Sequence, residues 1–257
     1  MNRKRLVVVD IGSHELEELL VLLGPFRRQV VVYVKWAVKK VLKAILKLNF
    51  YAIGGLGRQW KVVRYYFLDR RSYDLQVICV EPNVSVAQPY VERLSRKYPV
   101  HYMPAAVLGH DAGAPAELKT LFFYDRSISS SIYRKDRPTN DERASVCIGL
   151  KFDVIWEGLI KEGVIERGTP FLLRMNCEGA ELGVVECCSK NGLKPLCIIG
   201  SIGDVDKIHG RESGDRTRHL MKDMNAPYFY FKGDDPATWH DMISVWEGYA
   251  APFRKDS

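Results

Sequence analysis

The sequence opens with an apolar run that is best accommodated in a buried strand. Residues Leu6 to Val9 read Leu-Val-Val-Val, and the run ends in Asp10, with Gly12 two positions later. Apolar residues on both sides of an extended chain are typical of a central parallel strand covered on both faces. A glycine turn after such a strand exposes backbone N–H groups at the carboxyl edge of the sheet, where nucleotide-like ligands bind. We therefore expect a ligand loop here.

The composition excludes several classes of protein. The 257 residues are 47% hydrophobic and 27% charged, close to the globular average, which argues against a disordered or fibrous chain. No segment approaches the roughly 20 consecutive apolar residues of a membrane span, and the first apolar run is too short for a signal peptide. The six cysteines show no CxxC spacing, so we expect buried free thiols rather than a zinc site or a disulfide framework. A cytoplasmic location is the expectation.

Apolar runs and amphipathic stretches alternate along most of the chain. This alternation predicts an α/β fold with an open, mostly parallel central sheet and helices on both faces. We expect a single domain over residues 1–257. The stretches that carry the prediction are a helix over Glu15 to Leu23, strands over Leu75 to Val80, Val100 to Val107, Thr169 to Cys177 and Pro195 to Gly200, and helices over Val86 to Lys97 and Phe152 to Glu162.

The positive charge is concentrated in one segment. Between Arg27 and Arg71 there are twelve Lys or Arg and one acidic residue, so this segment carries +11 and the rest of the chain −4, for a net charge of +7. Within it, Tyr33 to Leu48 predicts a basic amphipathic helix. Its apolar side would carry Val34, Val38, Val41, Ile45 and Leu48, and its polar side five lysines.

Three interpretations of this helix remain open. The lysines form a solvated face on a helix whose apolar side packs on the domain, or they contact an anionic membrane surface, which a tryptophan among the lysines, Trp36, would suit. Alternatively, the segment 27–71 binds nucleic acid or an acidic acceptor. The second interpretation would make the protein peripheral to a membrane.

A second buried strand ends in Glu81-Pro82-Asn83. An acidic residue at the tip of the second strand accepts hydrogen bonds from ribose hydroxyls in dinucleotide-binding sheets, about 20 residues after the glycine loop. Here Glu81 lies 71 positions after Asp10. Since the difference is close to the length of the basic segment, we interpret residues from about 27 to 74 as an insertion after the first βα unit.

Three stretches in this order resemble the FkbM family of S-adenosylmethionine-dependent methyltransferases. They are VVVDIGSH (Val7 to His14), VICVEPN (Val77 to Asn83) and LLRMNCEGAE (Leu172 to Glu181), and PAAVLG (Pro104 to Gly109) also falls where that family has related sequence. The resemblance covers nearly the whole chain apart from the basic insertion. It implies a Rossmann-like class I methyltransferase fold, S-adenosyl-L-methionine as cofactor, and methylation of a hydroxyl on a sugar, glycan or related small molecule.

The resemblance also implies roles for individual residues. Asp10, Gly12 and Ser13 would approach the methionine and sugar part of the cofactor. Glu81 would hold the ribose hydroxyls, with Asn83 near the adenosine. The implied cofactor-binding set is Asp10, Gly12, Ser13, His14, Glu81, Pro82, Asn83 and Ala105, and the implied catalytic set, where the acceptor meets the methyl group, is Asn176, Glu178 and Glu181.

The chemistry of methyl transfer is compatible with these residue types. An in-line displacement needs alignment and removal of the acceptor proton, so a single carboxylate can serve as the base. Glu178 is the first choice for that base and Glu181 the second. For each, the alternative is a helix-start carboxylate that interacts with the helix dipole.

Two histidines are further candidates for bases or ligands, His209 and His240, although a structural role is the more common one for a single histidine. Asp204, Asp206 and His209 are close enough in sequence to hold a divalent metal together.

Two other functions use the same features. A nicotinamide-dependent oxidoreductase would use the same sheet edge, but the loop after the first strand lacks the GxGxxG pattern. A non-catalytic Rossmann-like protein would bind nucleic acid or a membrane through the basic insertion.

Overall fold

The computed structural model divides the chain into two compact units. The sheet unit consists of Met1–Leu16 and Leu75–Tyr230, and the helical unit of Glu17–Asp74 and Phe231–Ser257. The insertion expected at about 27–74 lies within the helical unit, which also includes the C-terminal segment. The structure describes residues 5–12, 17–23, 26–46, 61–62, 64–65, 73–124, 129–133, 144–231 and 236–254.

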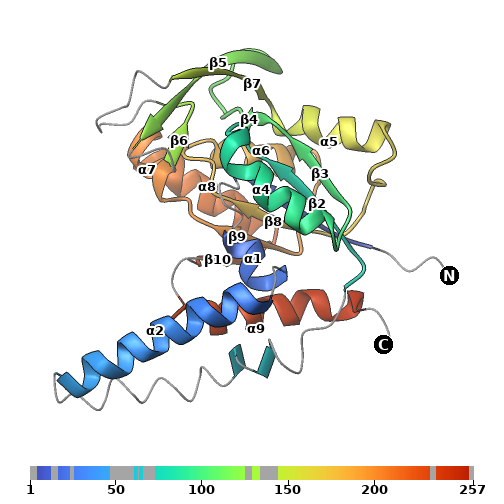
Figure 1. Cartoon of the computed structure of the whole chain (residues 1–257). Helices are drawn as coiled ribbons and strands as arrows, with labels where there is room; N and C mark the ends of the chain where they lie inside the picture. The colour runs from blue at the N-terminus through green and yellow to red at the C-terminus, as the bar shows by residue number, and fades with distance from the viewer. Residues whose placement is uncertain are drawn as a thin grey trace. The chain divides into compact units, whose positions relative to one another are not determined.

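A six-stranded sheet forms the centre of the sheet unit, and all its neighbouring strands pair in parallel (Figure 1). This confirms the predicted α/β class and the mostly parallel sheet. Numbered along the chain, the strands run 3-2-1-4-5-6 across the sheet, which is the order of doubly wound dinucleotide-binding sheets. The strands are β1 (Leu6–Ile11), β2 (Leu75–Val80), β3 (Val100–Met103), β8 (Phe171–Met175), β9 (Cys197–Gly200) and β10 (Tyr228–Phe229).

Helices cover both faces of this sheet. Helix α4 (Val84–Ser95) connects β2 to β3, and α6 (Glu181–Lys190) connects β8 to β9. Because the two crossovers run in opposite directions from β1, and parallel crossovers are right-handed, α4 and α6 lie on opposite faces. On the face of α6, helices α5 (Phe152–Lys161) and α8 (Arg211–Asp223) share the hydrophobic core with β1 and β8, and α7 (Gly203–His209) precedes α8.

A smaller sheet begins where the third predicted strand is interrupted. Pro104 separates β3 from β4 (Ala105–Val107), because proline has no N–H to donate to a ladder. The smaller sheet has the order β4-β7-β5-β6, with β4 parallel to β7 and β5 antiparallel to both of its neighbours. Its other strands are β5 (Ala116–Tyr124), β6 (Ser129–Ser131) and β7 (Ser145–Leu150).

The helical unit contains α1 (Glu17–Leu23), α2 (Phe26–Leu46), α9 (Trp239–Ala250) and the short 3-10 helix η4 (Ala251–Phe253). The predicted basic helix is therefore present, but it begins at Phe26 rather than at Tyr33. Aromatic side chains pack on α9: the rings of Tyr73 and Trp246 meet edge to face at 5.2 Å, and those of Tyr33 and Trp239 lie 6.4 Å apart. No helix in the described part of the chain is long and apolar enough to cross a bilayer.

A buried ion pair joins the two strands at which the sheet order reverses. Asp10 of β1 and Arg174 of β8 are partners in the parallel register, and Arg174 Nη1 donates to Asp10 Oδ1 at 3.1 Å. Their side chains are only 1% and 6% exposed. The same Nη1 donates to the Gly12 carbonyl at 2.7 Å. The pair therefore ties the end of β1 to the end of β8.

We expect Arg174→Met to lower the free energy of unfolding by about 3–5 kcal/mol, because it removes the guanidinium from beside a buried carboxylate. The control is Arg167→Met, which breaks the exposed pair with Glu157 and should cost no more than about 1 kcal/mol. Urea unfolding of the full chain measures both. A similar small loss for both variants would contradict a structural role for the buried pair, and Asp10→Asn combined with Arg174→Met should recover part of the loss.

Candidate functional site

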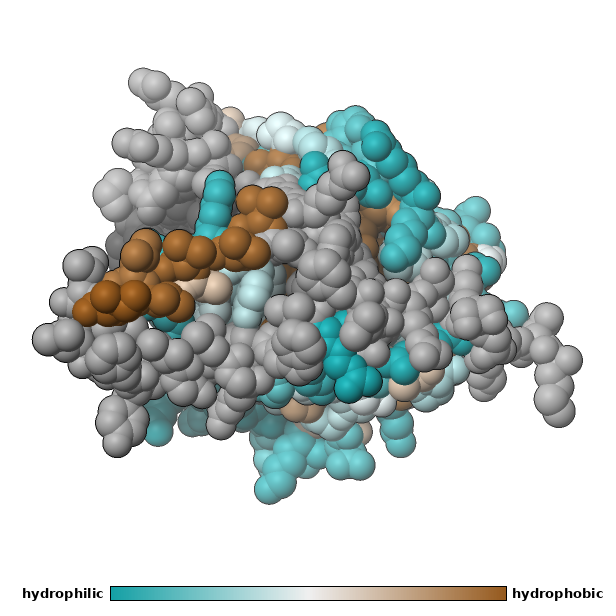
Figure 2. Space-filling view, turned by 60° about the horizontal axis from the view of Figure 1, so that its bottom comes forward, coloured by the Kyte–Doolittle hydropathy of each residue, from teal (hydrophilic) through white to brown (hydrophobic). Residues whose placement is uncertain are grey.

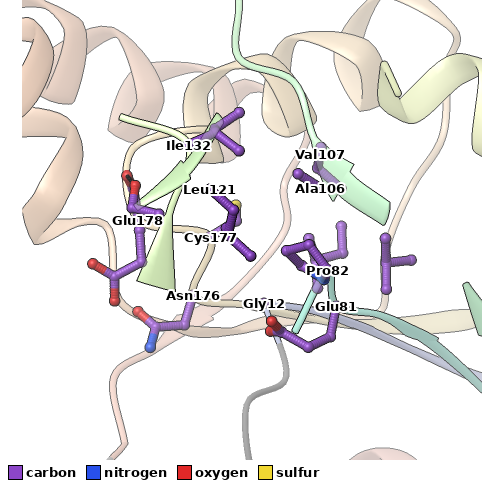
Figure 3. A pocket seen from close by; sticks show the side chains of 13 residues that line it. Gly12, Glu81, Pro82, Ala106, Val107, Leu121, Ile132, Asn176, Cys177 and Glu178 are labelled. Atoms are coloured by element: carbon purple, nitrogen blue, oxygen red, sulfur yellow. Dashed lines mark hydrogen bonds between the residues drawn. The ribbon is translucent and has the colours of Figure 1, made fainter. Parts of the chain in front are cut away.

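A pocket lies at the carboxyl edge of the parallel sheet, between the ends of β1, β2 and β8 (Figure 3). Ligands of open α/β sheets bind where the strand order reverses, here between β1 and β8. The smaller sheet supplies the opposite wall. The lining residues are Ile11, Gly12, Val80, Glu81, Pro82, Ala106, Val107, Leu121, Ser131, Ile132, Asn176, Cys177 and Glu178.

Backbone hydrogen bonds continue past the ends of the strands and align the loops of the pocket. The N–H of Asn176 donates to the carbonyl of Ile11 at 3.0 Å, and the N–H of Gly12 donates to the carbonyl of Val80 at 2.9 Å. The chain therefore leaves β1 and β8 as two loops in direct contact. The backbone of the sheet therefore sets where the two loops begin.

Gly12 makes this contact possible. Its φ of +69° lies in the left-handed region, and a Cβ at this position would collide with the carbonyl oxygen of Asn176. Only glycine combines this backbone conformation with so close an approach.

We expect Gly12→Ala to destabilise the protein by several kcal/mol and to displace Asn176. Gly163→Ala is a matched control, because Gly163 has the same φ of +69° but nothing within 4 Å of its added Cβ. The control should show only the left-handed backbone cost of about 1–2 kcal/mol. The difference between the urea unfolding midpoints of the two variants measures the cost of the collision with Asn176. Equal midpoints would contradict this collision.

The structure brings three of the expected cofactor residues to the pocket: Gly12, Glu81 and Pro82. Glu81 is 2% exposed, and its Oε1 accepts the N–H of Asn83 at 2.9 Å. Asn83 itself is buried before α4, where its Oδ1 accepts the hydroxyl of Ser85 at 2.9 Å.

The other expected cofactor residues are placed differently. Asp10 is buried beside Arg174, and neither Asp10, Asn83 nor Ala105 is among the lining residues, although Ala106, the neighbour of Ala105, is. Ser13 and His14 lie outside the residues that the structure describes.

Of the expected catalytic residues, Asn176 and Glu178 line the pocket. Figure 3 shows them on one side, with Glu81 and Pro82 on the other. Glu178 has a φ of 56°, which is uncommon for a non-glycine residue and is often found at functional sites. Its carbonyl accepts the hydroxyl of Ser131 at 3.3 Å, so the loop after β8 is fixed to the smaller sheet.

Glu181 is the first residue of α6 and is fully buried outside the pocket lining. Its Oε1 accepts the N–H of Cys177 and its Oε2 the N–H of Gly179, both at 2.8 Å. Burial raises the pKa of Glu181 to about 7, although the backbone N–H bonds act in the opposite direction. Glu181 therefore braces the loop through two backbone hydrogen bonds at the start of α6, and its catalytic role stays a prediction.

The stability of the protein should depend on pH through Glu181. Since its pKa is raised from 4.5 to about 7 in the native state, that state holds the proton to higher pH and is favoured at low pH. The free energy of unfolding should therefore fall between pH 4.5 and about 7, by roughly 3 kcal/mol for this group. Urea unfolding of Glu181→Gln over this range should lose the slope, whereas Glu212→Gln, an exposed control, should keep it. An unchanged slope in Glu181→Gln would count against this assignment.

The three residues considered as a possible metal group, Asp204, Asp206 and His209, do not come together as one. Asp204 pairs with Lys207 at 2.9 Å and Asp206 with Arg218 at 3.1 Å. His209 instead lies at Gly179, with its Nε2 3.1 Å from the Gly179 carbonyl.

Residues distant in sequence surround His209. Its ring meets the rings of His110 and Tyr133 edge to face at 4.9 and 5.0 Å, and the Tyr133 hydroxyl donates to Asp111 Oδ1 at 2.9 Å. Ligand atoms of His110, Asp111 and His209 lie within 4.8 Å of one another. The second candidate histidine, His240, belongs to α9 of the helical unit, where its Nδ1 lies 2.9 Å from Asp241 Oδ1.

Sequence reasoning missed several apolar lining residues: Val107, Leu121, Ile132 and Cys177. Burial raises the pKa of the Cys177 thiol well above its usual value, so it stays protonated and behaves as an apolar group. Cys177 could have been predicted as a lining residue because it lies inside the NCEGAE stretch. No sequence signal indicates Leu121 and Ile132, because their position depends on the pairing of the smaller sheet.

No family model, no curated protein and no solved structure matches this chain.

Proposed function

We propose that the protein is an S-adenosylmethionine-dependent methyltransferase that transfers the methyl group to a hydroxyl of a sugar or related small molecule. The observation that carries the proposal is the pocket at the reversal of strand order, where Glu81, Asn176 and Glu178 come together from the ends of β2 and β8. The resemblance of the three sequence stretches to the FkbM family supports the same assignment.

The polar side chains of the pocket suit a nucleoside with a cationic substituent, because two of them, Glu81 and Glu178, are carboxylates. Glu81 follows the strand next to β1, the position from which a carboxylate accepts hydrogen bonds from ribose hydroxyls. The pocket is partly open and has an interior volume of about 30 Å³, much smaller than the roughly 300–1,000 Å³ of typical small-molecule sites, so a bound nucleoside would extend beyond the described walls.

Bound S-adenosylmethionine would supply an electrophilic methyl group on a positively charged sulfur. Glu178 would take the proton of the acceptor hydroxyl as the hydroxyl oxygen bonds to the methyl carbon. The carbon–sulfur bond would break at the same time, and the sulfur would leave as the neutral thioether of S-adenosylhomocysteine. The amide of Asn176 holds the acceptor by hydrogen bonding. The apolar side chains of Leu121 and Ile132 keep water from the reacting atoms, and alignment of the two reactants accounts for most of the rate enhancement.

Titration calorimetry with S-adenosylmethionine and S-adenosylhomocysteine tests the proposal. Wild-type protein should bind both, and Glu81→Ala should bind about 10- to 100-fold more weakly, because hydrogen bonds to a charged group contribute about 1.5–3 kcal/mol. Glu92→Ala, in the exposed part of α4, is the matched control and should bind normally. Absence of binding by folded wild-type protein would overturn the proposal.

A second variant separates the acceptor side from the cofactor side. Glu178→Gln should keep cofactor affinity but lose about 10²- to 10⁴-fold in methyl transfer, the usual contribution of a general base. Transfer is followed with isotopically labelled cofactor on a panel of sugars.

The sheet order favours one competing function. The order 3-2-1-4-5-6 is also that of nicotinamide-binding sheets, so the protein could be an oxidoreductase. NADH in the same calorimeter distinguishes the two functions. Binding of NADH without binding of S-adenosylhomocysteine would replace the first proposal, and binding of neither would favour the non-catalytic alternative.

A further inference from the structure

Helix α2 exposes an aliphatic surface to solvent. The side chains of this surface are each about half exposed: Val31 51%, Val34 49%, Val38 52%, Leu42 54% and Ile45 52%. Their spacing of three and four residues places them within about 80° of one another around the helix axis. We call them the apolar stripe, and Figure 2 shows a brown band along this helix.

The apolar stripe is not the side by which α2 packs. Tyr33, which is only 9% exposed, faces the ring of Trp239 in α9. At about 100° per residue, Tyr33 lies on the side of the helix opposite to Val38 and Leu42. The interpretation in which the apolar side packs on the domain is therefore wrong for Val34, Val38 and Ile45.

A row of lysines runs beside the apolar stripe. Lys35, Lys39 and Lys43 follow one another at four-residue spacing, and all three are exposed. The helix contains no acidic residue. Among the residues that the structure describes, none of the three lysines has a carboxylate within ion-pairing distance. Three like charges on one edge are stabilised by an anionic surface nearby.

We propose that α2 binds an anionic lipid bilayer, with its axis in the plane of the membrane. The apolar stripe would enter the boundary between headgroups and acyl chains, and the lysines would reach the lipid phosphates with their ammonium groups while their alkyl stems cover apolar surface. The adjacent apolar and basic strips of α2 match these two layers. Since no described helix can span a bilayer, the binding is peripheral.

Two other occupants fit less well. Nucleic acid offers phosphates to the lysines but no comparable apolar layer for five aliphatic side chains. A second copy of the chain would cover the apolar stripe but would offer the lysine row no anionic partner on the facing helix, because α2 contains no acidic residue. Only an anionic membrane satisfies both strips at once, and this inference is independent of methyl transfer.

Vesicle flotation of the full chain tests the proposal. The protein should float with vesicles of equal amounts of phosphatidylcholine and phosphatidylglycerol and remain unbound with phosphatidylcholine alone. Lys39→Gln and Lys43→Gln should each weaken binding about fivefold. Lys222→Gln, an exposed lysine of α8, should leave binding unchanged.

The double variant Val38→Glu and Leu42→Glu addresses the apolar stripe and should abolish flotation. Val154→Glu, at an exposed valine of α5 (38%), controls for a new charge on a helix surface and should bind as wild type. Because all these positions are exposed, urea unfolding midpoints should stay within the range of the controls, which separates lost binding from lost folding.

Several results would overturn the proposal. One is undiminished flotation of the double variant, and another is equal binding to neutral and anionic vesicles. RNA or DNA binding without vesicle binding would assign the lysines to nucleic acid. A dimer in analytical ultracentrifugation that the double variant converts to monomer would assign the apolar stripe to a second copy.

Discussion

The arrangement of the pocket depends on how β1 and β8 meet at their carboxyl ends. Arg174 donates to both the Asp10 carboxylate and the Gly12 carbonyl, so one guanidinium fixes the end of β1 and the first residue of its loop. A charged pair inside a sheet is tolerated only when its members are hydrogen-bonded, because desolvation is costly. Asp10 is thus held inside the sheet by Arg174, and the proposed contacts to a ligand at this edge are those of Glu81 and of the loop after β8.

The loop after β8 places Glu178 at the pocket and Glu181 in the protein interior. Glu178 has left-handed backbone, Gly179 follows with a φ of 114°, and the chain then enters α6 at Glu181. The turn leaves Glu178 at the pocket while Glu181 is buried beneath the loop and accepts its N–H groups. Sequence spacing does not reveal this division, because it depends on two backbone conformations that the residue types do not dictate.

The parallel sheet was predictable from the sequence because its strands are local signals. β1, β2 and β8 are mostly apolar, with one polar or charged residue each, and are buried along their whole length. The strand pairing of the smaller sheet was not predictable, since β5 pairs with β7 across a long connection and β4 follows β3 after a single proline. Leu118, Val146 and Ile148 are apolar yet exposed, so their pattern does not indicate a face. The pocket was therefore predictable on the side of Glu81 and Asn176 but not on the side of Leu121 and Ile132.

For the basic helix α2, the sequence predicts the helix but not which of its sides is packed. Periodicity identifies only part of the apolar stripe of α2, namely Val34, Val38 and Ile45. It does not indicate what the stripe faces, because helices that pack on a core and helices that lie on a membrane share the same pattern. The packed side of α2 is identified by Tyr33, whose ring lies against Trp239 of α9, a residue far away in sequence.

The uneven distribution of charge along the chain fits this arrangement. A segment of +11 within a chain of +7 concentrates attraction for an anionic surface in the helical unit, whereas the pocket residues Glu81 and Glu178 belong to the sheet unit. The proposed lipid binding and the proposed ligand binding therefore rest on different residues and should be separable by mutation.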